Sequence, residues 1–395
     1  MAQHFWPYGL PPETGGIALN LAGLGSLCRA VDALHGTSLA PAASAAADLI
    51  CCSLLLASAF KLLLAPGKIA AELRDPKMCG SHGGLLMALN AMCAELRSWD
   101  PAVASMAVHA CSGLQLAMLV WYLGWCWHIR SPPVPFWFPA TVGVGMSVVA
   151  GGAVGMAPAL QRFFLLLSCS LCALLWPWIA WRVARSDRIA PAPSVCVLAA
   201  PVSLVGLAFF ALHDGAAAAA AAARPRVVTA AGALPLARRH HSTAHTIFAL
   251  STLAAFATLV AVFRRRAILR RFVQPRRGWA HPEWSGVTFP LVATSIVALR
   301  WEASVVRLHG EALWPSVLAV LCALVVVPID LLFLLALPRW LANGLPPVPE
   351  WEEEEEHSVL HGQSGKRSTS TSARAVELEP LDVDLEAARA TQVQP

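Results

Sequence analysis

A series of long apolar runs constrains this chain more than any other feature. Each run holds about 17–25 residues, which is the length that an α-helix needs to cross a bilayer. Apolar residues make up 57% of the 395-residue chain and charged residues only 13%, about half the charged fraction of a typical soluble domain. The sequence therefore predicts an all-α polytopic membrane protein.

Ten segments are expected to span the membrane, and the third has the weakest apolar pattern. The expected spans are residues 10–31, 43–64, 80–96, 102–127, 131–154, 160–181, 195–212, 243–263, 284–306 and 313–337. We accordingly divide the chain into an N-terminal cytoplasmic segment (1–9), a ten-helix transmembrane pore domain (10–338) and an acidic, Ser/Thr-rich cytoplasmic tail (339–395). The tail has too few apolar residues to build a core and is expected to be disordered.

Basic residues gather after the even-numbered spans, for example Lys68, Arg130 and Arg185, and most densely within residues 264–277. Lys and Arg stay on the cytoplasmic side of a membrane. Both termini are therefore expected to be cytoplasmic, and we expect the membrane to be the plasma membrane. The net charge of +5 reflects this topology rather than binding to nucleic acid.

Three of the odd-numbered spans carry a proline in their first half, namely Pro139, Pro201 and Pro290. Proline removes a helical hydrogen bond and bends the helix, and transporter sites commonly form on such discontinuous helices. The alternation of kinked and straighter spans predicts helical hairpins, with the kinked member of each hairpin inside.

The ninth span concentrates the features of a pore helix. The bulky Phe289 stands beside Pro290, the hydroxyl residues Thr288 and Thr294 flank them, and Arg300 follows, about 16 Å further along the helix axis. This arrangement suits a helix that lines an anion path. A kinked packing helix, with Arg300 snorkelling to the interface, is the alternative.

Two polar residues mark the first span. Glu13 stands at its start, where a carboxylate complements the helix dipole; a role at the pore mouth or in carrying a proton is the alternative. Asn20 lies inside the span and is interpreted as an interhelical hydrogen-bonding group.

Histidines and cysteines do not form a recognisable metal site in the sequence. His240, His241 and His245 lie close together, but without a carboxylate or thiol partner, and we interpret them as surface histidines. Cys169 and Cys172 lie in the middle of an apolar run with no second pair, so packing is favoured over metal binding or redox chemistry. We expect no metal and no cofactor.

Four groups of short motifs, in order along the chain, are shared with one family. They lie in residues 5–21, 135–140, 199–201 and 284–300, the last group including Trp284–Pro290, Ala293–Ser295 and Arg300. In this order and spacing they resemble the plant slow-type anion channels, the bacterial tellurite-resistance proteins and the fungal malate and sulfite transporters, which form the tellurite-resistance/dicarboxylate transporter family. The resemblance covers about residues 5–338.

The resemblance implies five hairpins around a central pore, one pore per subunit of a homotrimer, and an occluding aromatic ring at Phe289. It also places Arg300 where a plant channel has a basic residue. The first helix departs from the family, because Gly16 stands where relatives have an aromatic residue and Asn20 replaces a usual glycine.

Two transport functions follow from these features. The first is an anion channel or facilitator, voltage-independent, for chloride, nitrate, sulfite or malate. The second is a proton-coupled dicarboxylate (malate) or sulfite transporter, which needs a titratable group such as Glu13, with Glu95 behind it. An enzyme is not expected, since the sequence has no zinc-type His/Glu spacing and no nucleophile elbow. Residues 368–372 of the tail follow two basic residues and suit a basophilic kinase.

Overall fold

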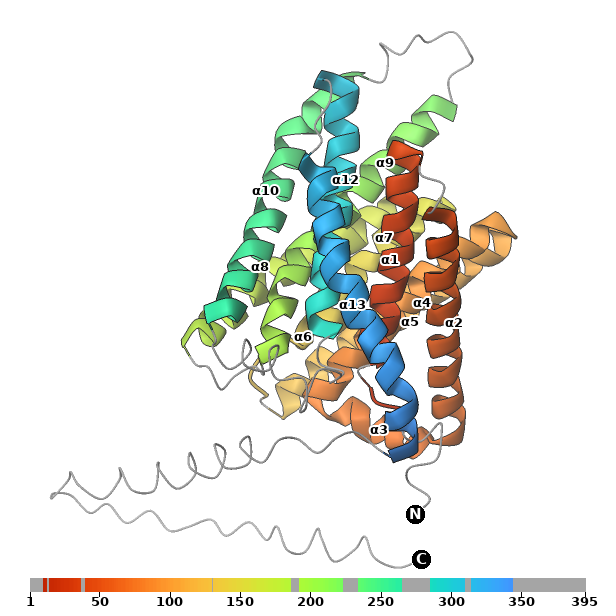
Figure 1. The fold of residues 1–395 in the computed structure, drawn as a ribbon, viewed down its shortest axis with the longest axis vertical. Coiled ribbons are helices and arrows are strands. Elements are labelled where there is room, and N and C mark those ends of the chain that lie inside the picture. Colours follow the sequence, from red (N-terminus) through yellow and green to blue (C-terminus); the bar gives the residue numbers. More distant parts are fainter. Residues whose placement is uncertain are drawn as a thin grey trace, which may run out of the picture. The chain divides into compact units, whose positions relative to one another are not determined.

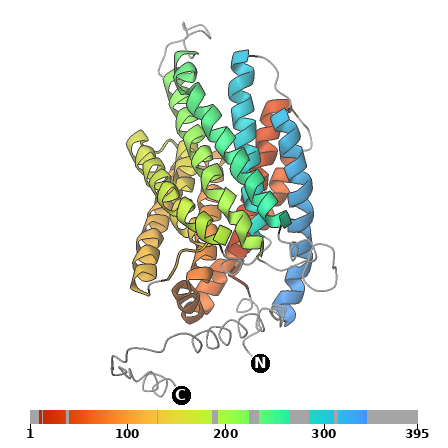
Figure 2. The ribbon, with the colours of Figure 1, turned by 90° about the vertical axis from the view of Figure 1, so that its left-hand side faces the viewer.

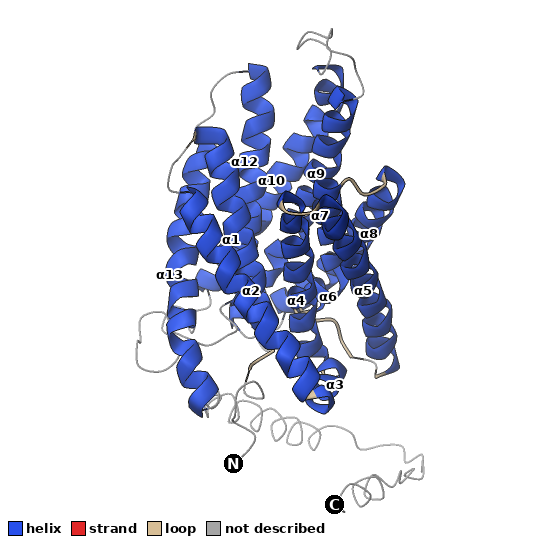
Figure 3. Ribbon diagram, turned by 90° about the vertical axis from the view of Figure 1, so that its right-hand side faces the viewer, coloured by secondary structure: helices blue, strands red, loops and turns tan. Residues whose placement is uncertain are grey.

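The computed structural model describes residues 10–12, 14–36, 40–129, 131–185, 192–222, 234–264, 285–309 and 314–343. Within these ranges the chain is helical and contains no strand (Figures 1 and 3). The helices are α1 (Thr14–His35), α2 (Ala40–Leu64), α3 (Pro66–Arg74), α4 (Pro76–Glu95), η2 (Leu96–Ser98), α5 (Pro101–His128), α6 (Trp137–Thr141), η3 (Val142–Gly145), α7 (Met146–Val154), α8 (Pro158–Arg185), η4 (Ala192–Ala199), α9 (Ala200–Ala222), α10 (Leu234–Arg264), α12 (Ser285–His309) and α13 (Trp314–Asn343).

Five helical stretches among the described residues are long and apolar enough to cross a membrane. They are Pro41–Leu64, Pro101–His128, Trp137–Val154, Pro158–Arg185 and Cys196–His213. Together with the family assignment given below, they support an integral, multi-pass membrane protein. The finer expectation of ten spans goes beyond this finding and is taken up under the proposed function.

The helices form an inner and an outer layer. In the spans at Trp137–Val154 and Cys196–His213 about two-thirds of the residues are buried, 67% and 61%, but in α2, α5 and α8 the shares are 28%, 33% and 22%. The outer helices expose large apolar side chains such as Met106, Leu166 and Leu174, which is the composition of a surface that faces lipid.

Contacts between helices follow a regular plan. Consecutive helices touch in the pairs α1–α2, α4–α5, α7–α8, α9–α10 and α12–α13. In addition, α1 contacts α4, α4 contacts α6 and α7, α7 contacts α9, α9 contacts α12, and α12 contacts α1. The inner helices therefore close into a ring. The long helices run side by side in two perpendicular views (Figures 1 and 2).

Two inner elements are broken rather than simply kinked. The fifth expected span consists of α6, the 3₁₀ segment η3 and α7, and the seventh begins with the 3₁₀ segment η4 before α9 starts one residue ahead of Pro201. Tighter 3₁₀ stretches inside a helix often mark a hinge or a strained segment. Both breaks lie beside the inner cavity described below.

Residues 66–74, which lie between the second and third expected spans, form helix α3. Pro66 occupies the first turn of this helix, where a missing N–H costs nothing. Ile69 and Glu72 are buried on its inner side. The charged composition of this stretch hid a helix whose buried side carries an acidic residue.

Several expectations fall outside the described residues. These are the N-terminal segment 1–9, the basic segment 265–284, Arg130, Arg188 and the tail from residue 344 onward.

Candidate functional site

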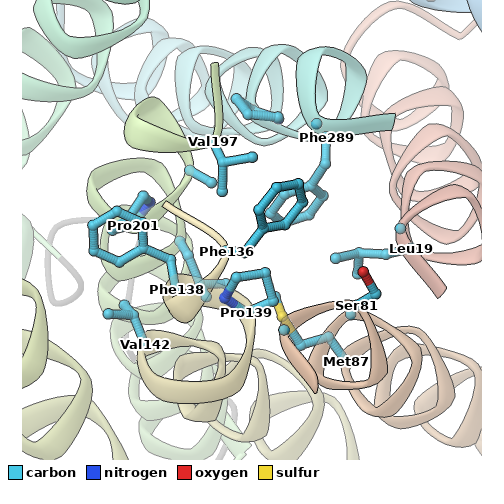
Figure 4. A pocket seen from close by; sticks show the side chains of 17 residues that line it. Leu19, Ser81, Met87, Phe136, Phe138, Pro139, Val142, Val197, Pro201 and Phe289 are labelled. Carbon is cyan, nitrogen blue, oxygen red and sulfur yellow. The ribbon is translucent and has the colours of Figure 1, made fainter. Parts of the chain in front are cut away.

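A cavity lies where the inner helices meet. Its volume is about 60 Å³, enough for roughly four water molecules at ~15 Å³ each. Its wall is built from α1, α4, the α6–η3 segment, the η4–α9 segment and the start of α12 (Figure 4). The lining residues are Gly16, Leu19, Gly80, Ser81, Gly84, Met87, Phe136, Phe138, Pro139, Val142, Val197, Ala200, Pro201, Leu204, Gly286, Phe289 and Pro290.

The cavity brings together four residues that the sequence analysis chose. Pro139, Pro201, Pro290 and Phe289 come from three different inner elements and all line this space. Gly16, where the sequence departs from relatives, lines it too, so the wall of α1 is opened by the absence of a side chain.

Phe136 is a second aromatic residue at the site, and the sequence analysis did not assign it a role. Its ring projects into the cavity, as does that of Phe289 (Figure 4). The signal was present in the run Pro135–Pro139, where an aromatic residue stands beside a proline, as it does at Phe289 and Pro290.

Glycines on α4 allow the segment that carries Phe136 to approach. A Cβ atom added at Gly80 would collide with the carbonyl oxygen of Phe136, and one added at Gly83 would lie 2.6 Å from the backbone nitrogen of Ala140. Small residues let helix backbones approach closely inside a membrane. The weak apolar pattern of the third expected span is therefore the consequence of its packing.

The lining of the cavity is almost wholly apolar. Ser81 is the one side chain with a hydroxyl group among the residues that line it. A narrow space of this composition offers few polar groups to water or to an ion.

The hydroxyl residues chosen from the sequence lie outside this lining. Thr294 Oγ1 donates to the carbonyl oxygen of Pro290 at 2.8 Å and lies 2.8 Å from Ser203 Oγ of α9. Thr141 Oγ1 likewise donates to the carbonyl oxygen of Trp137 at 2.8 Å. Thr288 is buried and accepts a hydrogen bond from Asn20 Nδ2.

Carbonyl groups at the helix breaks are hydrogen-bonded by side chains of the outer helices. Gln115 Nε2 of α5 donates to Gly143 O at 2.7 Å, and from α8 Ser168 Oγ donates to Val142 O at 2.9 Å. Trp176 Nε1, also of α8, donates to Leu198 O at 2.6 Å. Broken helices are tolerated in membranes when neighbours satisfy the freed groups in this way.

Arg300, which was also chosen from the sequence, does not line the cavity. Arg300 is exposed on α12, and eleven residues at about 100° each place it about 20° from the face of Phe289. Glu13 lies outside the described residues, as do the side chains of His240 and His241. His245 Nδ1 accepts a hydrogen bond of 3.0 Å from Trp301 Nε1.

A buried carboxyl group, which the sequence analysis missed, lies on α13, the helix that packs against α12. Asp330 is 4% exposed, and the side chains of Thr288 and Asn20 hydrogen-bond to it. The bond from Asn20 of α1 to Thr288 of α12 confirms Asn20 as an interhelical hydrogen-bonding group. The sequence did contain a pattern that points to Asp330, because Asp330 is the one charged residue in the apolar run 313–337.

A second buried acid lies where α2, α3 and α4 meet. Lys61 Nζ donates to both carboxylate oxygens of Glu72, at 2.6 and 2.9 Å, and to the carbonyl oxygen of Leu10 at 2.8 Å. His82 Nε2 lies 3.1 Å from Glu72 Oε2. Burial opposes ionisation of Glu72, but the hydrogen bonds from His82 and Lys61 and their charges outweigh it and hold the pKa of Glu72 below its usual value.

A third charged group joins α1, α2 and α4 near the other end of α1. Arg29 contacts Asp48 and Glu95, each at 2.6 Å. Glu95, the second titratable candidate from the sequence, is therefore half of an ion pair.

A ring of inner helices around an apolar cavity, wrapped by helices with exposed apolar side chains, defines a multi-pass helical membrane protein. Residues 10–335 match the family described as voltage-dependent anion channel, and the chain belongs to this family. The match confirms the family resemblance found in the sequence. No protein of curated function matches the chain.

Proposed function

We propose that this protein lets small anions cross a membrane through the central passage, and that Phe289 is the gate. The observation that carries this proposal is the meeting of Phe289 with Pro139, Pro201 and Pro290 in one occluded apolar cavity. Chloride, nitrate, sulfite and malate are the proposed anions. The activity involves no covalent chemistry, so the protein is not proposed to be an enzyme.

In this mechanism the ring of Phe289 keeps the narrowest part of the passage dry. Movement of the ring, with a small change at the Pro290 kink, widens the space and lets water and an anion in. Arg300, three turns along the same face of α12, raises the local concentration of anions at one mouth. Thr288 and Thr294 support the gate helix through their hydrogen bonds rather than contact the ion.

The full proposal includes ten spans as five hairpins, a homotrimer with one pore per subunit, cytoplasmic termini, a plasma-membrane location, a kinase acting on the tail and voltage-independent conduction. The contact pattern of the inner and outer helices supports the hairpins. The family name speaks of voltage dependence, and a current–voltage series on the purified protein tests that property directly.

The second candidate is a proton-coupled dicarboxylate or sulfite transporter on the same fold. It requires a group that exchanges a proton during the cycle, for which the sequence offers Glu13. Concentrative uptake of labelled malate or sulfite under a proton gradient, lost in Glu13→Gln, would favour this candidate over the channel.

Replacing the gate ring is the direct test of the channel. In liposomes, Phe289→Ala is expected to raise the anion current on the order of tenfold, which corresponds to lowering the barrier by about 1.4 kcal/mol. Phe163→Ala on the exposed face of α8 is the matched control and should leave the current unchanged. An unchanged current in well-folded Phe289→Ala contradicts the assignment of the gate.

A further inference from the structure

The Asp330 carboxyl group is the buried titratable group nearest to the gate that the proposed mechanism does not use. Asp330 lies on α13, which contacts α12 and α1, and it is 4% exposed. An ionisable side chain in the interior of a membrane protein is costly to keep and commonly marks a functional site.

The groups that contact this carboxyl are neutral. Thr288 of α12 and Asn20 of α1 hydrogen-bond to it, and Asp330 Oδ2 has no hydrogen-bond partner among the described residues. The site therefore has an open acceptor position on a buried oxygen, and its two known partners carry no charge.

The charged and titratable groups of α1 and α12 lie far along the helix axes from Asn20 and Thr288, the two residues that bond to Asp330. With described side chains, α1 carries Cys28, Arg29, Asp32 and His35, and α12 carries Arg300 and Glu302. Cys28 is eight residues from Asn20, and Arg300 is twelve residues from Thr288, or about 12 and 18 Å along the helix. The charge of the Asp330 carboxyl is therefore not neutralised by a close cation on the described parts of these helices.

The same contacts connect Asp330 to the cavity. Thr288 directly precedes Phe289, and Asn20 directly follows Leu19, and both Phe289 and Leu19 line the cavity. One layer of helix backbone separates the carboxyl from the cavity. Across about 10 Å with an effective dielectric constant of ~20, a unit charge changes the occupancy of an anion on the order of tenfold.

We propose that Asp330, Asn20 and Thr288 form a proton-binding site that controls anion transport. The ionised carboxylate repels an anion from the cavity, and the protonated carboxyl admits it. Binding linkage is reciprocal, so an anion in the cavity also favours protonation of Asp330. This inference rests on the proposed function, and it supplies a titratable group at the gate that the sequence analysis sought at Glu13.

The test is anion current in liposomes between mildly acidic and mildly alkaline pH, with equal pH on both sides. Wild-type current should fall on the order of tenfold as the pH rises. Asp330→Asn should keep the acidic level of current throughout, and Asp330→Glu should keep the pH dependence. Asp32→Asn, which removes an acid near the far end of α1, is the matched control and should behave as wild type.

A hydrogen-bonding variant separates proton binding from a structural role. Thr288→Val removes a donor that stabilises the ionised carboxylate. It should therefore move the midpoint of the pH profile to higher pH, whatever its effect on the level of current. A merely structural role of Thr288 would change the level of current at every pH and leave the midpoint in place.

Two results would overturn the proposal: a pH profile retained in folded Asp330→Asn, or a current in this variant that is low at every pH. If Asp330→Asn does not fold, an unmoved midpoint in Thr288→Val overturns it instead. If wild type, Phe289→Ala and Asp330→Asn all give no current with any anion, the proposed channel function is contradicted instead. If Phe289→Ala carries an anion current but Asp330→Asn has the same pH profile as wild type, only this inference is contradicted.

Discussion

Two buried carboxyl groups in this protein differ in their partners, not in their burial. Glu72 is 5% exposed and Asp330 is 4% exposed. Glu72 is held by Lys61 and His82, but Asp330 is held by the neutral side chains of Thr288 and Asn20. Cationic partners stabilise the ionised form of a buried acid, whereas neutral partners offset less of the cost of burying its charge.

Their positions match this difference. The Lys61–Glu72 pair joins α2 to α3, and Lys61 also holds the carbonyl oxygen of Leu10 just before α1. It therefore fixes structure at one end of the bundle. Asp330 bonds to Thr288, which directly precedes the cavity-lining Phe289.

The largest expected effect comes from breaking the ion pair on one side only. Lys61→Met leaves the Glu72 carboxylate buried without its closest cation, and removing one partner of a buried pair costs about 3–5 kcal/mol. Thermal unfolding in detergent should show a large loss of stability. The double variant Lys61→Met/Glu72→Leu removes both charges and should recover much of that loss. Failure to recover any of it would show that Lys61 acts through Leu10 instead.

A smaller effect is expected from acid. The pKa of Glu72 lies below its ordinary value of 4.5 in the folded protein. Its ionised form therefore stabilises the fold fully above that ordinary value, and this contribution is lost as the pH falls through the lowered pKa. The difference in unfolding temperature between wild type and Glu72→Gln should shrink in this acidic range. A difference that grows on acidification would contradict the assigned direction.

The smallest effect on stability is expected at Asp330. Asp330→Asn keeps the size of the side chain and its capacity to bond to Thr288 and Asn20, so the free energy of unfolding should change by about 1 kcal/mol or less at neutral pH. The same unfolding measurement applies. A loss of unfolding free energy as large as that of Lys61→Met would show that Asp330, like Glu72, stabilises the fold. The contrast between the two sites would then disappear.

The sequence predicted the helical class, the family and the residues around the gate, because long apolar runs and prolines carry those signals locally. Phe289, Pro139, Pro201 and Pro290 were chosen one by one and line one cavity. The helix α3 was hidden by its charged residues, since its inward side buries Glu72, an acid, rather than an apolar stripe.

Asp330 and Phe136 were missed for a different reason. Each stands in a run that was interpreted only for its length or its prolines. Their importance comes from contacts between segments that are far apart in the sequence. Helix α13 contacts α1 and α12, and residues 136–140 approach Gly80 and Gly83. No local pattern encodes such contacts.

The carbonyl groups at the helix breaks have a consequence for the outer helices. Gln115, Ser168 and Trp176 point inward from the lipid-facing layer and satisfy Gly143, Val142 and Leu198. Each side chain withdrawn strands a buried acceptor at about 1–3 kcal/mol. The shape of the cavity therefore depends on both layers of helices, and a substitution in an outer helix can change that shape without replacing a residue that lines the cavity.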